Sequence, residues 1–262
     1  MGDAPLGKAE TAGTIDDPAV QKAIFEQAYR QTCEQLEDAG TDSDIEALSR
    51  ANTRRNEAID EQVAAFASKR GAECTSGCSF CCHQMVVCTP LEIFDIARHI
   101  LDTKPDVEIA RIKGQLAALA PLPLDIDARY GADKPCALLE DNRCTIYAHR
   151  PSLCRTMLST SRAACEASLN AKEPAVPFIP EPVVLSFMLQ LGIDYALIQC
   201  KHLSTEKVEM SRALLIALEN FEETFSHWIK GQDPFPDCAI DMGNGLTNRD
   251  MAETAAAYCG VV

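Results

Sequence analysis

The sequence predicts a mainly α-helical, single-domain fold around a cysteine-rich core with a short β-hairpin. Apolar residues recur at helical spacing both before and after the cysteine-rich segment, which is typical of amphipathic helices. Sustained alternation of apolar and polar residues is missing, so strand is expected only in short pieces near residues 136–147. A chain of 262 residues can bury a core without cross-links, so its 13 cysteines need another explanation.

We divide the chain into four segments by composition and periodicity. Residues 1–15 are rich in Gly, Ala, Thr and Asp and are expected to be mobile. Residues 16–70 form a helical N-terminal segment, and residues 71–170 form the cysteine-cluster core, which we expect to bind metal. Residues 171–262 form a C-terminal helical segment packed on that core.

Two long helices are expected in the N-terminal segment. The first begins at Pro18, because two aspartates precede it and proline favours the first helical position. Its apolar stripe comprises Val20, Ile24, Ala28 and Leu36. Cys33 lies beside this stripe and is interpreted as a small core residue. The second helix is expected from about residue 43 to residue 70, with Gly71 ending it.

Two proline-led helices follow the first cysteines. The T-P-L-E motif at residues 89–92 is a capping box with proline at the first helical position, and Pro105 begins the next helix. Residues 120–135 are expected to form a loop. Two short apolar runs around the Asp-Asn pair at 141–142 then predict the hairpin.

The remaining elements are a short helix containing Cys154, an extended linker and two longer helices. Four prolines within residues 171–182 favour the linker. The two helices are expected over about residues 183–198 and 204–230. The first is apolar, but it is shorter than the roughly 20 residues that span a bilayer.

The formal net charge of −15, from 24 basic and 39 acidic residues, limits the possible partners. Binding to nucleic acid or to an anionic membrane surface needs clustered Lys and Arg. The N-terminus has no basic region followed by an apolar run, so a secretory signal is not indicated. We therefore expect a cytoplasmic protein without nucleic-acid or membrane partners. In a reducing cytosol its cysteines point to metal binding or catalysis rather than to disulfides.

The strongest functional signal is the C-x3-C-x2-C-C array formed by Cys74, Cys78, Cys81 and Cys82. Gly77 lets the loop turn back, and the short spacings let several thiolates converge on one ion or cluster. Thiolates are soft ligands that select zinc, copper(I) or iron–sulfur clusters. In an extended loop, Cys81 and Cys82 would point in opposite directions. The array would then serve two metal atoms, or one of the adjacent pair would not be a direct ligand.

A second set of cysteines lies downstream, at Cys136, Cys144, Cys154 and Cys165. Together the two sets supply eight thiols, enough for two four-thiolate sites or one polynuclear site. The two sets are far apart in sequence. If both bind one shared metal, the fold must bring their sulfurs within roughly 4 Å of each other, because each sulfur bonds directly to that metal. At least one of Cys136, Cys144 and Cys154 should approach the first array even without metal.

Charged neighbours of the cysteines have two interpretations each. His83 could be a nitrogen ligand, although a hydrogen bond to a cluster sulfur is favoured. Arg150 and Arg155 flank Cys154 and either offset thiolate charge or form surface ion pairs. Four further cysteines have no partner at ligand spacing: Cys88, Cys200, Cys238 and Cys259.

Both cysteine sets carry a family resemblance. Residues 77–84 (GCSFCCHQ) and the TPLE motif resemble the first half of the YkgJ-type cysteine-cluster family, also called the CxxCxxCC zinc- or iron-chelating domain. Residues 135–155, with their PCALL, NRCTIY and HRPSLCR motifs, resemble its second half, and the resemblance covers about residues 71–170. It implies bound zinc or iron, often as an iron–sulfur cluster, in a bacterial cytosolic protein. It implies no reaction, but the flagellin lysine methylases share the cysteine pattern, so an enzyme stays open.

The spacing of Cys74, Cys78 and Cys81, with Phe80 before the last cysteine, also matches the loop of radical S-adenosylmethionine enzymes. In that loop three cysteines hold a four-iron cluster and leave one iron open. However, no strand precedes Cys74, and no run of alternating strands and helices predicts the usual barrel. An enzyme that uses S-adenosylmethionine for methyl transfer on a different scaffold therefore remains as the alternative.

The sequence therefore supports two hypotheses. The first is a metal-binding protein that holds zinc or iron, as an iron–sulfur or polynuclear iron site, through Cys74, Cys78, Cys81, Cys82, Cys136, Cys144, Cys154 and Cys165. The second is an iron–sulfur-dependent enzyme with an open iron site, for example an S-adenosylmethionine-linked methyltransferase. No catalytic residue is indicated, and the sequence contains no P-loop, Rossmann or serine-hydrolase motif.

Overall fold

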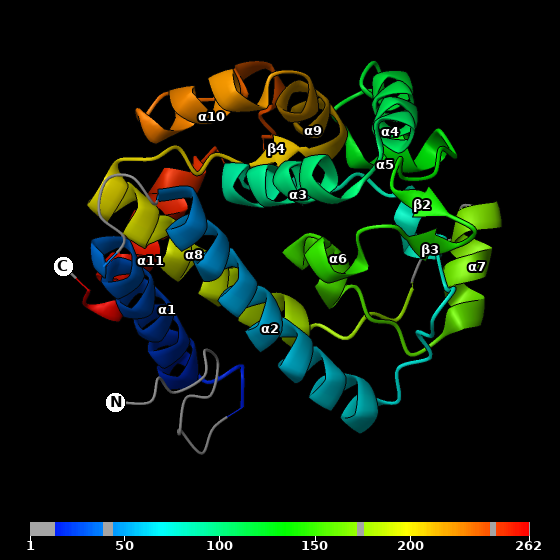
Figure 1. Cartoon of the computed structure of the whole chain (residues 1–262). Coiled ribbons are helices and arrows are strands. Elements are labelled where there is room, and N and C mark those ends of the chain that lie inside the picture. Colours follow the sequence, from blue (N-terminus) through cyan, green and yellow to red (C-terminus); the bar gives the residue numbers. More distant parts are fainter. Residues whose placement is uncertain (1–13, 39–43, 172–175, 242–244, 262) are drawn as a thin grey trace.

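The computed structural model describes residues 14–38, 44–171, 176–241 and 245–261 (Figure 1). The protein is 67% helical, and the described residues form eleven α-helices and two small antiparallel strand pairs. The prediction of a mainly α single domain is confirmed. Most of the segment predicted to be mobile, residues 1–13, lies outside the described residues, as do residues 172–175 of the predicted linker.

The helices lie in chain order as α1 (Pro18–Asp38), α2 (Asp44–Arg70), α3 (Pro90–Thr103), α4 (Asp106–Leu119), α5 (Ile126–Gly131), α6 (Ser152–Thr156), α7 (Arg162–Ala171), α8 (Glu181–Lys201), α9 (Met210–Glu219), α10 (Phe221–Ile229) and α11 (Asn248–Cys259). The strands are β1 (Val87–Cys88), β2 (Leu139–Glu140), β3 (Arg143–Cys144) and β4 (Val208–Glu209). Short 3-10 helices are η1 (Phe80–His83), η2 (Tyr147–His149) and η3 (Pro236–Cys238).

The first two helices match the sequence prediction. α1 begins at Pro18 and buries the predicted stripe, and α2 ends where Gly71 takes a φ of +69°. Glycine reaches this left-handed region without the penalty that a side chain would incur. One residue differs from the prediction, because Cys33 is only half-buried and is not a core residue.

α8 is the central helix of one half of the molecule, where it packs against α1, α2 and α11 (Figure 1). It extends beyond the predicted residues 183–198 at both ends. α1 passes so close to Gly192 that a Cβ there would lie 2.6 Å from the backbone oxygen of Phe25. The same Cβ would lie 2.9 Å from the Cβ of Ala28, so the crossing requires glycine.

The length and hydropathy of α8 would also allow it to cross a membrane, and no other helix among the described residues meets that criterion. A buried core helix can meet it too, and 67% of the apolar window of α8 is buried. The contacts with α1, α2 and α11 favour the core interpretation.

α3 begins with the predicted capping box. The Thr89 hydroxyl oxygen accepts a hydrogen bond from the Glu92 N–H, and the Glu92 carboxylate accepts one from the Thr89 N–H at 2.9 Å. Pro105 stands at the start of α4, also as predicted. α3 and α4 both pack on α9, which lies far from them in sequence.

The single helix predicted over residues 204–230 is wrong. The segment forms β4, α9 and α10, with a break at Asn220, whose φ of −140° and ψ of 53° are not helical. The break lets Phe221 and Trp228 pack on Phe94 in α3, with ring centroids 5.9 and 5.1 Å away. Helical periodicity cannot reveal this, because the aromatic partner belongs to another helix.

The hairpin of β2 and β3 is confirmed, with Leu139 paired with Cys144. Asp141 and Asn142 have φ values of +47° and +60°, as the two central residues of a type I′ turn require. The other pair, in which β1 and β4 lie antiparallel, was not predicted. The loop predicted over residues 120–135 is wrong in part, because α5 forms within it, and α7 and α11 were not predicted.

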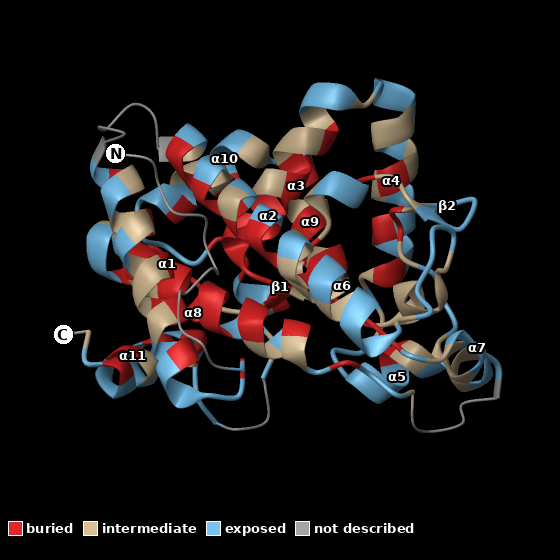
Figure 2. Cartoon of the chain, turned by 90° about the horizontal axis from the view of Figure 1, so that it is seen from below, coloured by how far each residue is buried: buried red, intermediate tan, exposed pale blue. Residues whose placement is uncertain are grey.

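Buried residues concentrate where α8, α3 and α9 lie (Figure 2). By contrast, α5, α7 and β2 gather at one end of the molecule, where most residues are exposed or half-buried. The cysteine-bearing elements β3 and α7 belong to this end (Figure 1). Apolar packing alone therefore holds the cysteine-rich end less firmly than the helices around α8.

The close crossing of α1 and α8 gives the first prediction. Gly192→Ala should lower the free energy of unfolding by about 1–3 kcal/mol, because the new Cβ overpacks the contact with Phe25 and Ala28. Gly114→Ala is the matched control, since Gly114 lies within α4 and nothing stands within 4 Å of its added Cβ. It should stabilise the protein by about 0.5–1 kcal/mol. Urea denaturation measures both, and equal effects would contradict the crossing.

Candidate metal centre

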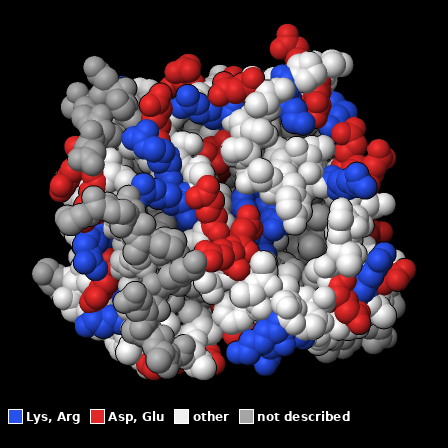
Figure 3. Space-filling view, turned by 60° about the horizontal axis from the view of Figure 1, so that its bottom comes forward, with Lys and Arg blue, Asp and Glu red and all other residues white. Residues whose placement is uncertain are grey.

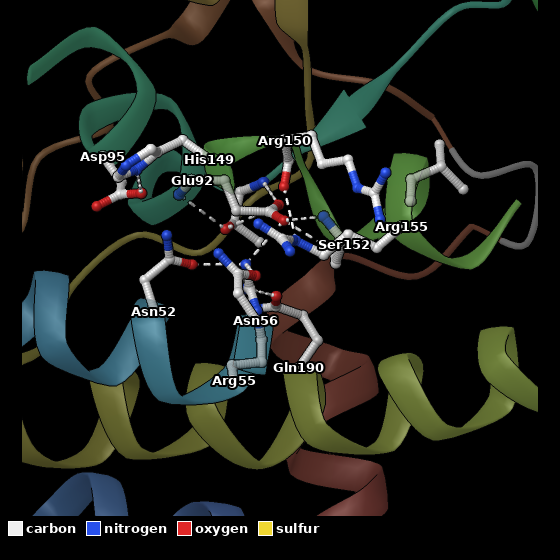
Figure 4. Close-up of polar contacts among 12 residues, drawn as sticks. Asn52, Arg55, Asn56, Glu92, Asp95, His149, Arg150, Ser152, Arg155 and Gln190 are labelled. Atoms are coloured by element: carbon white, nitrogen blue, oxygen red, sulfur yellow. Dashed lines mark hydrogen bonds and ion pairs between the residues drawn. The ribbon is translucent and has the colours of Figure 1, made fainter. Parts of the chain in front are cut away.

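A buried ion pair joins the helices next to the cysteine-rich end (Figure 4). Nη2 of Arg55 in α2 lies 2.9 Å from Oε1 of Glu92 in α3, and neither side chain is more than 3% exposed. The same oxygen accepts hydrogen bonds from the N–H and the hydroxyl of Ser152, each at 2.8 Å. Because Ser152 begins α6, which carries Cys154 and Arg155, Glu92 positions that helix.

The electrostatics of Glu92 favour its charged form. Burial by itself raises the pKa of Glu92, but Arg55, Lys207 and the hydrogen bond from the Ser152 N–H lower it to about 2. The carboxylate therefore stays ionised at neutral pH and balances the charge of the fully buried Arg55.

Arg155, within α6, binds the residues that precede this helix and also binds α2. Its guanidinium donates hydrogen bonds to the carbonyls of Arg150 and Ala148 and forms an ion pair with Asp60 in α2. The Arg155 side chain is 1% exposed. The surface ion-pair interpretation is therefore wrong for Arg155, although Arg150 pairs with the same carboxylate at 3.4 Å.

Arginines also oppose the rise in thiol pKa at this end of the molecule. Burial raises the pKa of Cys144, and Arg150 and Arg155 cancel part of that rise. Burial raises the pKa of Cys136 to about 11, and Arg129 lowers it in part. Arg129 belongs to α5, is buried and was not singled out from the sequence. Positive charge thus lies where several thiolates would otherwise repel one another.

The first cysteine array has a different backbone from the one expected. The loop turns back at Gly77, which has a φ of +85°, as predicted. Residues 80–83 form the 3-10 helix η1 instead of an extended loop. The thiols of Cys81 and Cys82 are consequently in hydrogen-bond contact, and the prediction that they point in opposite directions is wrong. Both side chains can therefore face the same centre.

The two cysteine segments lie side by side. The Cys136 N–H donates a hydrogen bond to the Cys82 carbonyl at 2.8 Å, which joins the hairpin segment to the array. The Ser159 N–H donates to Sγ of Cys74 at 3.4 Å. α7, which carries Cys165, packs against η1. These contacts bring residues from about 74 to 82 against residues from about 136 to 165.

Cys81 interacts with thiols from both segments. A hydrogen bond to Cys82, followed by burial, raises the pKa of Cys81. Burial is the main cause of the raised pKa of Cys74, Cys154 and Cys165, and the charge of Cys81 raises each pKa further. Those three cysteines belong to the loop, α6 and α7, so one thiol lies near three separate elements.

Among the described residues, no three Cys, His, Asp or Glu side chains are arranged to hold a metal ion. The assignment of individual ligands therefore stays a prediction. The chemistry of the donor set fits zinc or iron, because the neighbouring donors are soft thiols with arginines close by. The predicted ligands are Cys74, Cys78, Cys81, Cys82, Cys136, Cys144, Cys154 and Cys165.

Cys88 has no partner at ligand spacing in the sequence, but the fold brings it near Cys154. Cys88 in β1 is fully buried, and burial, followed by the charges of Glu92 and Cys154, raises its pKa well above the usual value. The hydrogen bond predicted from His83 to a cluster sulfur stays a prediction. Its ring Nδ1 lies 3.5 Å from the carboxylate of Asp133.

A family model covers this part of the chain. Residues 73–173 match the family CxxCxxCC, described as "Putative zinc- or iron-chelating domain". The matched range contains all eight predicted ligands, and the resemblance expected over about residues 71–170 is confirmed. Comparison with curated proteins and with solved structures finds no match.

The buried ion pair gives the second prediction. Glu92→Gln should lower the free energy of unfolding at pH 7 by about 3–5 kcal/mol, because Arg55 loses the charge that balances it. Since the folded-state pKa of Glu92 is lowered from 4.5 to about 2, its stabilising effect is complete above pH 4.5. The effect is lost as the pH falls through about 2. Urea denaturation over this pH range should therefore show the difference between wild type and variant shrinking.

Glu253→Gln is the control for that experiment. Glu253 is 48% exposed and pairs with Arg249 at 3.7 Å one helical turn away. Such a surface pair contributes about 0.5 kcal/mol or less. A Glu92→Gln variant no less stable than Glu253→Gln, or a deficit that persists unchanged at low pH, would contradict the role given to Glu92.

Proposed function

We propose that the protein binds zinc or iron through the clustered cysteines of residues 73–173, with iron held as an iron–sulfur cluster or a polynuclear site. The observation that carries this proposal is the hydrogen bond from the Cys136 N–H to the Cys82 carbonyl at 2.8 Å, which brings the two cysteine sets together. The charge of Cys81 also contributes to the raised pKa of Cys74, Cys154 and Cys165, which come from three separate elements. The match to a family of zinc- or iron-chelating domains supports the same chemistry.

The proximity of the two cysteine sets favours one shared centre over two isolated four-thiolate sites. The hydrogen bond from Cys136 to the carbonyl of Cys82 connects the sets directly. Two closed sites would each need four thiolates of their own. Cys81 would then bind only one of the two metals, although it has neighbouring thiols in both cysteine sets.

The charge distribution also supports a thiolate centre. Several thiolates around one metal carry net negative charge, which is costly in a partly buried place. Arg129, Arg150 and Arg155 lie near enough to oppose the raised pKa of Cys136 and Cys144. Their role would be to stabilise the deprotonated form that binds metal.

An enzyme with an open iron site is the alternative function. One observation favours it: Cys74 is exposed, so the array is reachable from solvent on that side. A metal with an open coordination position could bind a substrate or S-adenosylmethionine there. The usual radical-enzyme barrel has no counterpart in the described residues, whose only strands are two antiparallel pairs.

We further propose a cytoplasmic location without a nucleic-acid or membrane partner. The net charge of −15 supports this. Figure 3 shows one face of the molecule, on which Lys and Arg are interspersed with Asp and Glu and do not form a continuous basic surface.

Metal content tests the ligand assignment. Protein prepared anaerobically should contain zinc or iron, and Cys81→Ser should lose most of it, because Cys81 is the neighbour of both cysteine sets. Cys259→Ser should retain the metal, since Cys259 is buried in α11, outside the family match. Elemental analysis measures the metal, and visible spectra separate iron–sulfur from zinc. Full metal in Cys81→Ser together with loss in Cys259→Ser would contradict the assignment.

Chelation should loosen the cysteine-rich end before the rest of the fold. Binding to thiolates that meet only in the folded state adds its free energy to folding. Amide hydrogen exchange should therefore accelerate first in residues 71–90 and 136–165 when the metal is removed. Protection of α1 and α8 should persist, because apolar packing holds these helices. Uniform loss of protection across the chain would contradict this separation.

A further inference from the structure

A pair of thiols lies outside the family match, at the contact between α1 and α8. Sγ of Cys33 is 2.8 Å from Sγ of Cys200, although the two residues are 167 positions apart in sequence. This distance is shorter than the roughly 3.5–4.0 Å at which nonbonded carbon atoms rest. It is longer than the roughly 2.05 Å of a disulfide bond. The two sulfurs are thus adjacent and not joined by a disulfide bond.

The packing of the two helices fixes this adjacency. Gly192 of α8 touches Ala28 of α1, and further along both helices the rings of Tyr29 and Tyr195 have centroids 5.1 Å apart. Contacts therefore advance along both helices in the same direction, and the thiol pair lies further along both helices. Two helices in such close contact along their length hold the pair without depending on a mobile loop.

The two thiols differ in their environment. Cys200 is exposed in the last turn of α8, whereas Cys33 is half-buried. Burial, followed by the hydrogen bond with Cys200, raises the pKa of Cys33 to about 12. Because the thiolate is the reacting form, Cys33 is a poor first nucleophile. A small reagent would meet Cys200 first.

We propose that Cys33 and Cys200 form a reversible disulfide by exchange with a low-molecular-weight disulfide of the glutathione type. The Cys200 thiolate attacks one sulfur of that disulfide, which forms a mixed disulfide and releases one small thiolate. Cys33, after transfer of its proton to solvent, attacks the Cys200 sulfur and releases the second small thiolate. The protein loses two protons and two electrons, and the small disulfide takes them up and is reduced to two thiols. The proposal does not depend on the metal site.

The expected result is a specific cross-link with a measurable effect on stability. Metal-loaded protein treated with glutathione disulfide, alkylated and digested without reduction should yield a peptide pair linked through Cys33 and Cys200. A dithiol reductant should reverse the link. Because the link closes a long loop in the unfolded chain, the Tm of the oxidised protein should rise by several degrees. Metal content should not change.

Variants separate the two steps. Cys33→Ser should stop at a stable glutathione adduct on Cys200, because no second thiol displaces it. Cys200→Ser should leave Cys33 unmodified. Cys238→Ser, which removes a buried thiol in η3, should still form the link. Full alkylation of both Cys33 and Cys200 in treated wild type would overturn the proposal, as would a linked peptide that joins either of them to a third cysteine.

Discussion

The ion pair between Arg55 and Glu92 is the interaction on which the cysteine-rich end depends. One carboxylate closes the capping box of α3, balances a fully buried guanidinium of α2, and accepts both donors of Ser152 at the start of α6. Removing two charges from water is unfavourable, so such a pair is weak evidence for stability by itself. Its effect here is geometric, because α6 can occupy only the place where Ser152 meets Glu92. Cys154 and Arg155 are carried into position with that helix.

The same polar layer links the family-matched region to the helices outside it. The guanidinium of Arg55 also donates to Gln190 of α8, whose amide donates to Asp194 at 2.6 Å. Asp194 accepts from Asn248 at the start of α11 at 2.8 Å. These hydrogen bonds connect α2, α8 and α11, which makes the layer specific to one arrangement of helices. The flanking helices are therefore part of the structure that orients α6.

Structural features that depend on neighbouring residues could be predicted from the sequence, whereas features that depend on distant residues could not. The start of α3, the end of α2 at Gly71 and the hairpin turn depend on residues within a few positions of one another. Helix caps and turn residues report such local geometry directly. The break at Asn220 depends instead on Phe94, more than a hundred residues away. The contact between Cys33 and Cys200 could not be predicted for the same reason, because the spacing of residues along the chain does not show which helices pack together.

The candidate site was predictable in its residue types but not in its electrostatics. The spacing of the cysteines identifies them as a cluster, whereas Arg129 comes near the cluster only through the fold of α5.

The charges around the cysteines determine how readily the thiols lose their protons. A hydrogen bond that the Cys81 thiol donates to Cys82, together with burial of Cys81, Cys136 and Cys154, favours the protonated thiols in the metal-free chain. Each thiol that binds a metal must lose its proton, so binding exchanges several protons for one cationic centre. The arginines reduce the repulsion among the resulting thiolates but cannot remove it. Convergence of the sulfurs on one centre is therefore expected to require the metal itself.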